Sequence, residues 1–199
     1  MNYFEPEATL RFSYADADGR MTARMVRVEH VDGDMITGRC LMKNARRTFR
    51  ADRISNCWDE ATHKYVPDVL QHLRHIHSTT SRGSLDTLYS SHPEILQILL
   101  YVGKADGQLR DAEIKVIAAA CKVLTGDVRI TETQVKELLS SMAIPSLHGF
   151  KIAVSKVAKR GNPATMRRVM LACKTIVNTQ KTISAAEQEA LDYMLRRLS

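Results

Sequence analysis

The sequence predicts an α+β protein in which a small β-rich segment precedes an all-helical one. Three observations carry this prediction. Apolar and polar residues alternate with a period of two over the first third of the chain, and the period becomes helical after Tyr65. In addition, 199 residues suffice for two small domains. We therefore expect a β domain at 1–65, a helix and linker at 66–84, and a helical bundle at 85–199.

The β-rich segment begins with a strand in which Leu10, Phe12 and Tyr14 share one face. Asp18-Gly19 predicts a hairpin turn, because this pair favours the positive φ angles of tight turns. Such a unit of four to five short strands must curl into a barrel or pack on helices to bury its apolar face. Further strands are expected at about 21–28, 35–42 and 47–58.

The helical segment carries clear start signals. Pro67 is expected to open a helix that ends near Thr79, and the small polar residues 78–84 predict a linker. Five or six helices are expected after it. The residues around Glu113 recur around Glu187, much later in the chain, and each set opens an apolar helix. This weak repeat indicates either a duplicated bundle or only the shared chemistry of two helix starts.

Composition excludes several classes of protein. The four cysteines are far apart and form no CxxC pair, so metal and redox motifs lack support and a reducing cytoplasm is the expected setting. No signal peptide and no membrane-spanning apolar run is found. No Ser/His/Asp order, phosphate-binding glycine loop or paired-carboxylate motif is found either, so we expect no enzyme and no cofactor.

The segment from Arg46 to Ile54 holds four arginines and one phenylalanine and is predicted to be a strand. Arginines held on a strand can present planar forks to an anion. The alternative is that Arg53 and Asp52 only form ion pairs at the rim of the barrel. Tyr14 and Phe49 are candidates for base stacking, or else are core residues. The predicted anion-contacting residues are Arg24, Arg47, Arg50 and Arg53.

A second basic segment lies in the helical part, since no acidic residue occurs between Glu137 and Glu187. A segment of one sign raises the local concentration of anions and favours a phosphate-rich or acidic partner. The alternative is an ordinary solvated helix face. The candidates for nucleic-acid contact here are Lys159, Arg160, Arg167 and Arg168.

The segment Arg47-Thr48-Phe49-Arg50-Ala51-Asp52-Arg53-Ile54 resembles the closing strand of bacterial WYL domains, which often has the pattern Arg-x-Phe-Arg-x-Asp-Arg-Ile. Phe12-Ser13-Tyr14, Asp18-Gly19-Arg20, Arg24 and Cys40 extend the resemblance over residues 8–60. The Trp-Tyr-Leu tripeptide is absent, and Asp34-Met35-Ile36-Thr37 stands near its place. The resemblance implies a small Sm-like β-barrel whose basic groove binds a nucleotide or single-stranded nucleic acid. No helix-turn-helix reader precedes it, so a promoter-binding repressor is not expected.

Residues 99–114, with Ala105-Asp106-Gly107 at their centre, resemble the tellurite-resistance TerB family over about residues 85–198. The resemblance implies an internally duplicated helical bundle with an acidic, metal-associated site at Asp106, Asp111 and Glu113. In the second copy Thr179-Gln180-Lys181 replaces Ala-Asp-Gly, so only Glu187 remains of the acidic set. A turn followed by a helix with acids in its first turn is the alternative to a metal site.

Together these patterns predict a non-enzymatic, regulatory, two-module bacterial binding protein. Its basic surfaces are expected to bind single-stranded or duplex nucleic acid, or a nucleotide, without a membrane. The alternative is a protein-interaction scaffold in a stress-response or phage-defence assembly, in which the basic helical face docks onto an acidic protein. The sequence leaves the ligand and the oligomeric state open, and a dimer is compatible with it.

Overall fold

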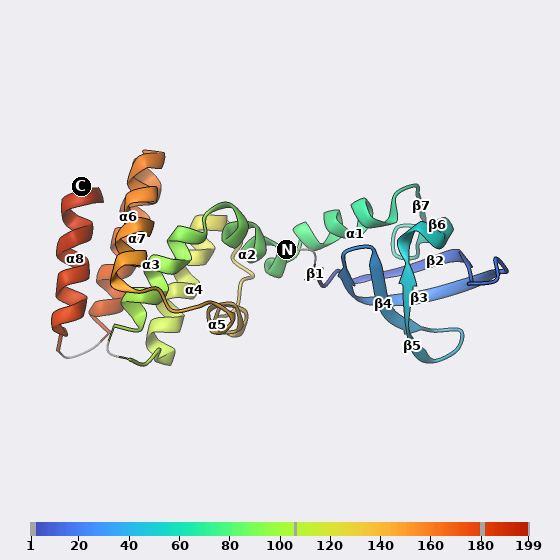
Figure 1. Ribbon diagram of the computed structural model, residues 1–199, viewed down its shortest axis with the longest axis horizontal. Helices are drawn as coiled ribbons and strands as arrows, with labels where there is room; N and C mark the ends of the chain where they lie inside the picture. Colours follow the sequence, from blue (N-terminus) through green and yellow to red (C-terminus); the bar gives the residue numbers. More distant parts are fainter. Residues whose placement is uncertain (1–2, 106, 180–181, 199) are drawn as a thin grey trace. The chain divides into compact units, whose positions relative to one another are not determined.

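The computed structural model contains an antiparallel sheet followed by helices, which confirms the α+β class (Figure 1). The structure describes residues 3–105, 107–179 and 182–198. The chain divides into two compact units, of which the first ends at Gly83 and the second begins at Ser84.

The described part of the first unit has seven strands in one sheet, more than the four to five predicted. Their order is β5-β4-β3-β2-β6-β7, and β1 pairs with β3. Leu10 and Phe12 are buried while Arg11 between them is exposed, as the alternation predicts. The strands are β1 (Tyr3–Phe4), β2 (Ala8–Ala15), β3 (Met21–Asp32), β4 (Met35–Cys40), β5 (Ala45–Arg50), β6 (Ile54–Asp59) and β7 (Lys64–Val66).

The predicted closed barrel is not clearly formed, because backbone pairing among the described residues follows an open path from β5 to β7. The sheet nevertheless curls. The ring of Phe49 on β5 lies 5.3 Å from that of Phe12 and 5.1 Å from that of Tyr14, both on β2 and both edge-on. The Tyr14 hydroxyl also accepts a hydrogen bond from the backbone N–H of Arg50 at 3.3 Å. The inner faces of two unpaired strands therefore meet in one core.

The predicted strand at 47–58 is in fact two strands. β5 ends at Arg50, a short 3-10 helix η1 (Ala51–Arg53) follows, and β6 begins at Ile54. β5 pairs with β4, whereas β6 pairs with β2, so the chain must change direction between them. The period of two is a local signal and cannot report this change of partner.

Helix α1 (Val69–Ser78) completes the core of the first unit, since its Val69 and Leu73 are buried against the sheet. The helix begins after Asp68, whose carboxylate accepts from the backbone N–H of Gln71 at 2.9 Å, and not at Pro67 as predicted. Its His72 Nε2 lies 2.7 Å from the Asp59 carboxylate of β6.

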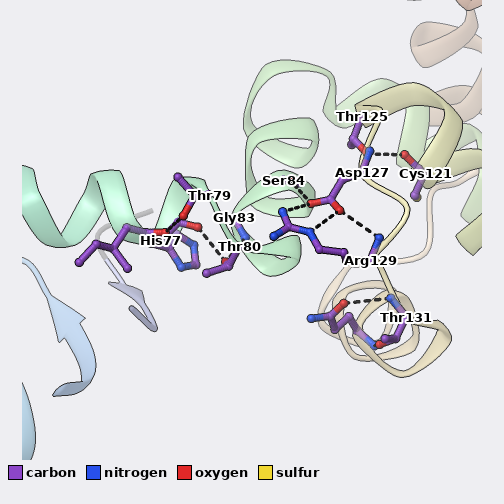
Figure 2. A network of polar contacts seen from close by, with 12 residues as sticks. His77, Thr79, Thr80, Gly83, Ser84, Cys121, Thr125, Asp127, Arg129 and Thr131 are labelled. Carbon is purple, nitrogen blue, oxygen red and sulfur yellow. Dashed lines mark hydrogen bonds and ion pairs between the residues drawn. The ribbon is translucent and has the colours of Figure 1, made fainter. Parts of the chain in front are cut away.

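The segment predicted as a linker is mostly helical. Only Thr79 and Thr80 separate α1 from α2 (Ser81–Ser91). The Thr80 hydroxyl donates to the His77 carbonyl at 2.7 Å and accepts from the Gly83 N–H at 3.0 Å (Figure 2). A Cβ on Gly83 would lie 2.0 Å from the His77 carbonyl oxygen, so this tight turn requires glycine.

The second unit is an all-helical bundle with one apolar core. Helix α3 packs against α6, α7 and α4, and α8 lies beside α6 and α7 (Figure 1). No helix within the described ranges is both long and apolar enough to cross a membrane. The helices after α2 are α3 (Pro93–Gly103), α4 (Asp111–Thr125), α5 (Glu132–Ser141), α6 (Leu147–Arg160), α7 (Pro163–Val177) and α8 (Ala185–Leu198).

The repeated motif forms the same structure twice. In each copy a loop joins two helices, α3 to α4 in the first and α7 to α8 in the second. The distance in sequence from the end of α3 to the end of α7 equals the distance from the start of α4 to the start of α8. The Glu113 carboxylate accepts from the backbone N–H of Arg110 at 2.7 Å, and that of Glu187 accepts from Ser184 N–H at 2.8 Å. Both glutamates are fully buried. The repeat therefore includes matched helix ends and matched buried caps.

The loop after α4 is held by one carboxylate, that of Asp127 (Figure 2). Arg129 donates to it from Nε and Nη2 at 2.9 and 2.8 Å, and Ser84 Oγ donates at 2.8 Å. These hydrogen bonds, the one from the Arg129 side chain first, hold the pKa of the Asp127 carboxyl well below its usual range.

Asp59→Asn should reduce the free energy of unfolding of the first unit by about 1–3 kcal/mol at neutral pH. Burial disfavours the charged form of Asp59, but hydrogen bonds from His72 and from the backbone N–H groups of Thr62 and Ala61 outweigh it, so its pKa is lowered. Because folding lowers the pKa of Asp59, its carboxylate stabilises the folded state at pH values above the unfolded-state pKa, near 4. This contribution is lost as the pH falls through the folded-state pKa. The difference between wild type and variant should therefore shrink in acid.

The fluorescence of Trp58, the only tryptophan, reports unfolding of this unit in urea. Asp18→Asn is the matched control, because Asp18 lies exposed in the turn between β2 and β3. A difference in the free energy of unfolding between wild type and Asp59→Asn that stays constant from pH 7 to 3 would contradict the lowered pKa of Asp59.

Candidate nucleic-acid interface

The outer face of the sheet carries three arginines side by side. Arg27 of β3 is the direct cross-strand partner of Arg39 on β4, which is in turn the partner of Arg46 on β5. All three are exposed, whereas Val26 and Val28 on either side of Arg27 are buried. Like charges placed directly opposite one another destabilise a sheet. We call this set the arginine row.

The positive charge of the arginine row is only partly compensated. Arg46 Nε donates to Glu29 Oε2 at 2.7 Å. Arg39 donates from Nε and Nη2 to Asn44 Oδ1 at 3.0 and 2.8 Å, which fixes the guanidinium without neutralising it. Within the part of the chain that the structure describes, the Arg27 side chain has no hydrogen-bonding or ionic partner. One carboxylate thus balances three guanidinium groups.

A shallow hollow of about 390 Å³ adjoins the arginine row. The hydroxyls of Thr37 and Thr48 lie 2.8 Å apart in its lining. Arg46, Arg47 and His30 complete the lining, so the hollow combines hydroxyl groups with two guanidinium groups. Such donors suit a phosphate or another oxyanion.

Two exposed aromatic side chains lie on the same outer face. Trp58 of β6 is the cross-strand partner of Arg11 on β2 and of Tyr65 on β7. Arg11 and Thr9 point outward because Leu10 between them is buried, and Thr9 is the partner of Arg27 in the arginine row. Trp58 and Tyr65 are 38% and 54% exposed, with ring centroids 5.6 Å apart. We call them the aromatic pair.

The aromatic pair and the arginine row together span the sheet. The distance from β6 to β5 along the curved outer face is four interstrand spacings, or about 19 Å. Arg11 lies between the two sets and is paired with Glu60 at 2.8 Å. The arrangement offers cations at one side and flat aromatic surfaces at the other.

The four arginines predicted from the sequence do not converge. Only Arg47 borders the hollow. Arg24 is half-buried and donates from Nη1 to the Ala23 carbonyl at 3.1 Å, and Arg53 lies in η1. Arg50 donates to both carboxylate oxygens of Asp52, at 3.1 and 2.7 Å. This hydrogen bonding raises the pKa of Arg50 and lowers that of Asp52.

The predicted stacking residues take part in the core instead of the outer face. Phe49 is 2% exposed, and the half-buried Tyr14 packs edge-on against it.

The four basic residues predicted in the helical unit lie in different surroundings. Lys159 borders a hollow of about 390 Å³ on α6, together with Lys151 and Lys156. Arg160 has a structural role, because its Nε lies 3.1 Å from the buried Glu94 carboxylate and its Nη1 donates to the Ser91 carbonyl at 2.8 Å. The other two lie on α7, where Arg167 is exposed and Arg168 donates to the Val123 carbonyl.

The residues predicted to bind metal do not form a ligand cluster. Asp106 lies outside the described residues. Asp111 is exposed and pairs with Lys136 at 3.3 Å, while the Glu113 carboxylate caps α4 from a buried position. No group of three or more His, Cys, Asp or Glu side chains that could hold a metal ion occurs among the residues for which placement is described.

Sequence reasoning missed the arginine row and the aromatic pair. Arg27, Arg39 and Arg46 are too far apart in the chain for a local motif to join them. The register of the predicted hairpins, which sets the cross-strand partners, is the one feature of the sequence that could have brought these arginines together. Comparisons of the chain with protein-family models, curated proteins and solved structures found no match. The resemblances to WYL and TerB-like domains therefore depend on the quoted residues alone.

Arg160→Ala should lower the free energy of unfolding of the helical unit by about 1–3 kcal/mol, because it leaves the buried Glu94 carboxylate with less compensation. The loss should be smaller than the roughly 3–5 kcal/mol typical of a fully buried pair, since the Arg160 side chain is 48% exposed. Urea unfolding followed by circular dichroism measures it.

Lys159→Ala is the matched control, as it removes the neighbouring exposed cation. Adding Glu94→Gln to Arg160→Ala should recover part of the loss, because it removes the buried charge. Equal stabilities of the Arg160→Ala and Lys159→Ala proteins would contradict the structural role.

Proposed function

We propose that the protein is a non-enzymatic binding protein whose β-sheet unit binds single-stranded nucleic acid on its outer face. The observation that supports this most is the presence of the arginine row and the aromatic pair on one solvated face. Binding of single strands generally combines cations that follow the phosphates with aromatic rings on which bases stack.

The charge of the face provides the sequence-independent part of binding. Phosphate contacts by Arg27, Arg39 and Arg46 release condensed counterions, which favours association at low salt. They also relieve the repulsion between adjacent guanidinium groups that the bare row carries. Guanidinium groups suit this role because their planar forks match phosphate oxygens.

The aromatic pair favours a single strand over a duplex. Bases in a duplex are stacked on one another, so the exposed rings of Trp58 and Tyr65 would find no base to contact. An unpaired base stacked on an aromatic side chain contributes about 1–3 kcal/mol. The span of about 19 Å across the sheet also exceeds what one nucleotide would use, which favours an oligomer over a free nucleotide.

The same proposal assigns the first unit to WYL-like domains and describes its curled sheet as an Sm-like barrel. The order of β2 to β6 and the contact of Phe49 with Tyr14 are compatible with such a form. The ligand-contacting residues differ from those that the resemblance implied, since β3, β4, β5, β6 and β7 each contribute one of them. A regulatory role in the cytoplasm belongs to the same proposal.

The test is titration of a labelled single strand of about 12 nucleotides, within the usual site size, followed by fluorescence anisotropy. Replacing Arg27, Arg39 and Arg46 by alanine should weaken binding about tenfold or more at low salt. It should also reduce the slope of log K against log salt by about 2, since each single-strand phosphate contact contributes about 0.7.

The matched control replaces Arg24, Arg50 and Arg53 by alanine, which removes the same charge from outside the arginine row. Its affinity should stay near that of wild type. Trp58→Leu should lose about 1–3 kcal/mol of binding free energy, and Trp58 fluorescence should be quenched on binding to wild type. Absence of binding at low salt, or equal losses in the two triple variants, would overturn the proposal.

A further inference from the structure

The helical unit exposes an apolar groove between α4 and α7, which we call the α4/α7 groove. Its volume is about 230 Å³. The most exposed apolar side chains in it are Val123, at 54%, and Leu171, at 66%. The residues that line it are Val116, Ala119, Ala120, Val123, Arg168, Leu171, Ala172 and Thr175.

The α4/α7 groove is a continuous feature rather than a set of scattered apolar residues. Val116, Ala120 and Val123 follow one another at helical spacing on α4, and Leu171 and Thr175 do so on α7. Single exposed apolar residues are ordinary, but contiguous apolar surface with a polar rim is typical of a site that binds a protein.

Cations surround the apolar floor. On α4, Lys115 and Lys122 lie four residues before and three after Ala119, which places them on its side of the helix. On α7, Arg167 and Lys174 stand in the same relation to Leu171.

A further cation is fixed at one end of the groove. The Arg168 Nη1 donates to the Val123 carbonyl at 3.4 Å, and this carbonyl belongs to the last turn of α4. A cation at that position interacts favourably with the negative end of the helix dipole.

The acidic residues of α4 and α7 do not offset this charge. Helix α7 has no acidic residue. Helix α4 has two, in its first turn, and both are engaged: Asp111 pairs with Lys136, while the buried Glu113 caps the helix. The rim of the groove is therefore positive over an apolar floor.

We propose that the α4/α7 groove binds an amphipathic helix of a partner protein, with apolar residues at i, i+3, i+4 and i+7 and acidic residues beside them. Helices of this kind bind apolar grooves through one face, and their flanking charges set specificity. The groove runs along α4 from Val116 to Val123, a rise of about 10 Å, which matches two turns of a docked helix.

Two other candidate occupants, nucleic acid and a second copy of this chain, fit the α4/α7 groove less well. Nucleic acid would be attracted to the cations, but its phosphates have no use for a floor made of valine, leucine and alanine side chains. A second copy of this chain carries a net charge of +7 and would bring the same cations to the groove. Only an acidic, amphipathic segment satisfies both the rim and the floor.

The probe is a synthetic, fluorescein-labelled peptide of about 18 residues, built of leucine at i, i+3, i+4 and i+7 and of glutamate and alanine elsewhere. It is titrated against the full chain by anisotropy. A peptide of the same composition, with its leucines spread around the helix, is the control. The amphipathic peptide should bind more tightly than its control, and raising the salt should weaken it.

Two pairs of variants locate the site. Val123→Ser with Leu171→Ser should weaken peptide binding about tenfold or more, because it removes the exposed apolar surface of the groove. Val128→Ser with Ile152→Ser removes exposed apolar side chains elsewhere and should leave binding unchanged. Arg168→Glu with Lys174→Glu should weaken binding, whereas Lys156→Glu with Lys159→Glu on α6 should have a much smaller effect.

Circular dichroism of each variant confirms that it is folded before its affinity is used. The variant that lacks Arg27, Arg39 and Arg46 should bind the peptide normally, so this proposal and the nucleic-acid proposal can fail separately. Equal binding of both peptides would overturn the groove proposal, as would unchanged affinity of the Val123→Ser/Leu171→Ser protein. Displacement of the peptide by an oligonucleotide, or dimerisation abolished by the same two substitutions, would also overturn it in favour of the other occupants.

Discussion

The inward packing of Leu10, Phe12 and Phe49 decides which way the arginines of the sheet point. Side chains alternate along each strand, so a buried residue at one position places its neighbours on the outer face. Burial of Phe49 leaves Arg46 outward, and the curl that brings Phe49 to Tyr14 brings the inner faces of β5 and β2 together. The arginine row and the aromatic pair therefore depend on the core beneath them.

Charged side chains in this protein divide into those that support the fold and those from which the fold gains little. Arg160 compensates the buried Glu94, and the buried Glu113 closes the first turn of α4. In contrast, Arg27 lies on a surface where the fold gains little from it. Net charge alone does not separate these two groups, because it counts a buried cap and an exposed cation in the same way.

The two candidate surfaces differ in chemistry, and the difference indicates different partners. The face of the sheet combines guanidinium groups with exposed aromatic rings, whereas the α4/α7 groove combines cations with an aliphatic floor. Phosphates and bases suit the first, and an acidic amphipathic helix suits the second. The surface proposed for a protein partner therefore lies on other elements than the surface proposed for nucleic acid.

The sequence by itself determined the α+β class, the inward face of β2 and the matched starts of α4 and α8, because alternation, helical period and capping are local properties. Only the tertiary structure decided that 47–58 forms two strands with different partners, and that Arg27, Arg39 and Arg46 stand side by side. It also tied Arg160 on α6 to Glu94 on α3, which is distant from it in the chain. Partners distant in the chain are set by packing and register, and no pattern within a short window contains that information.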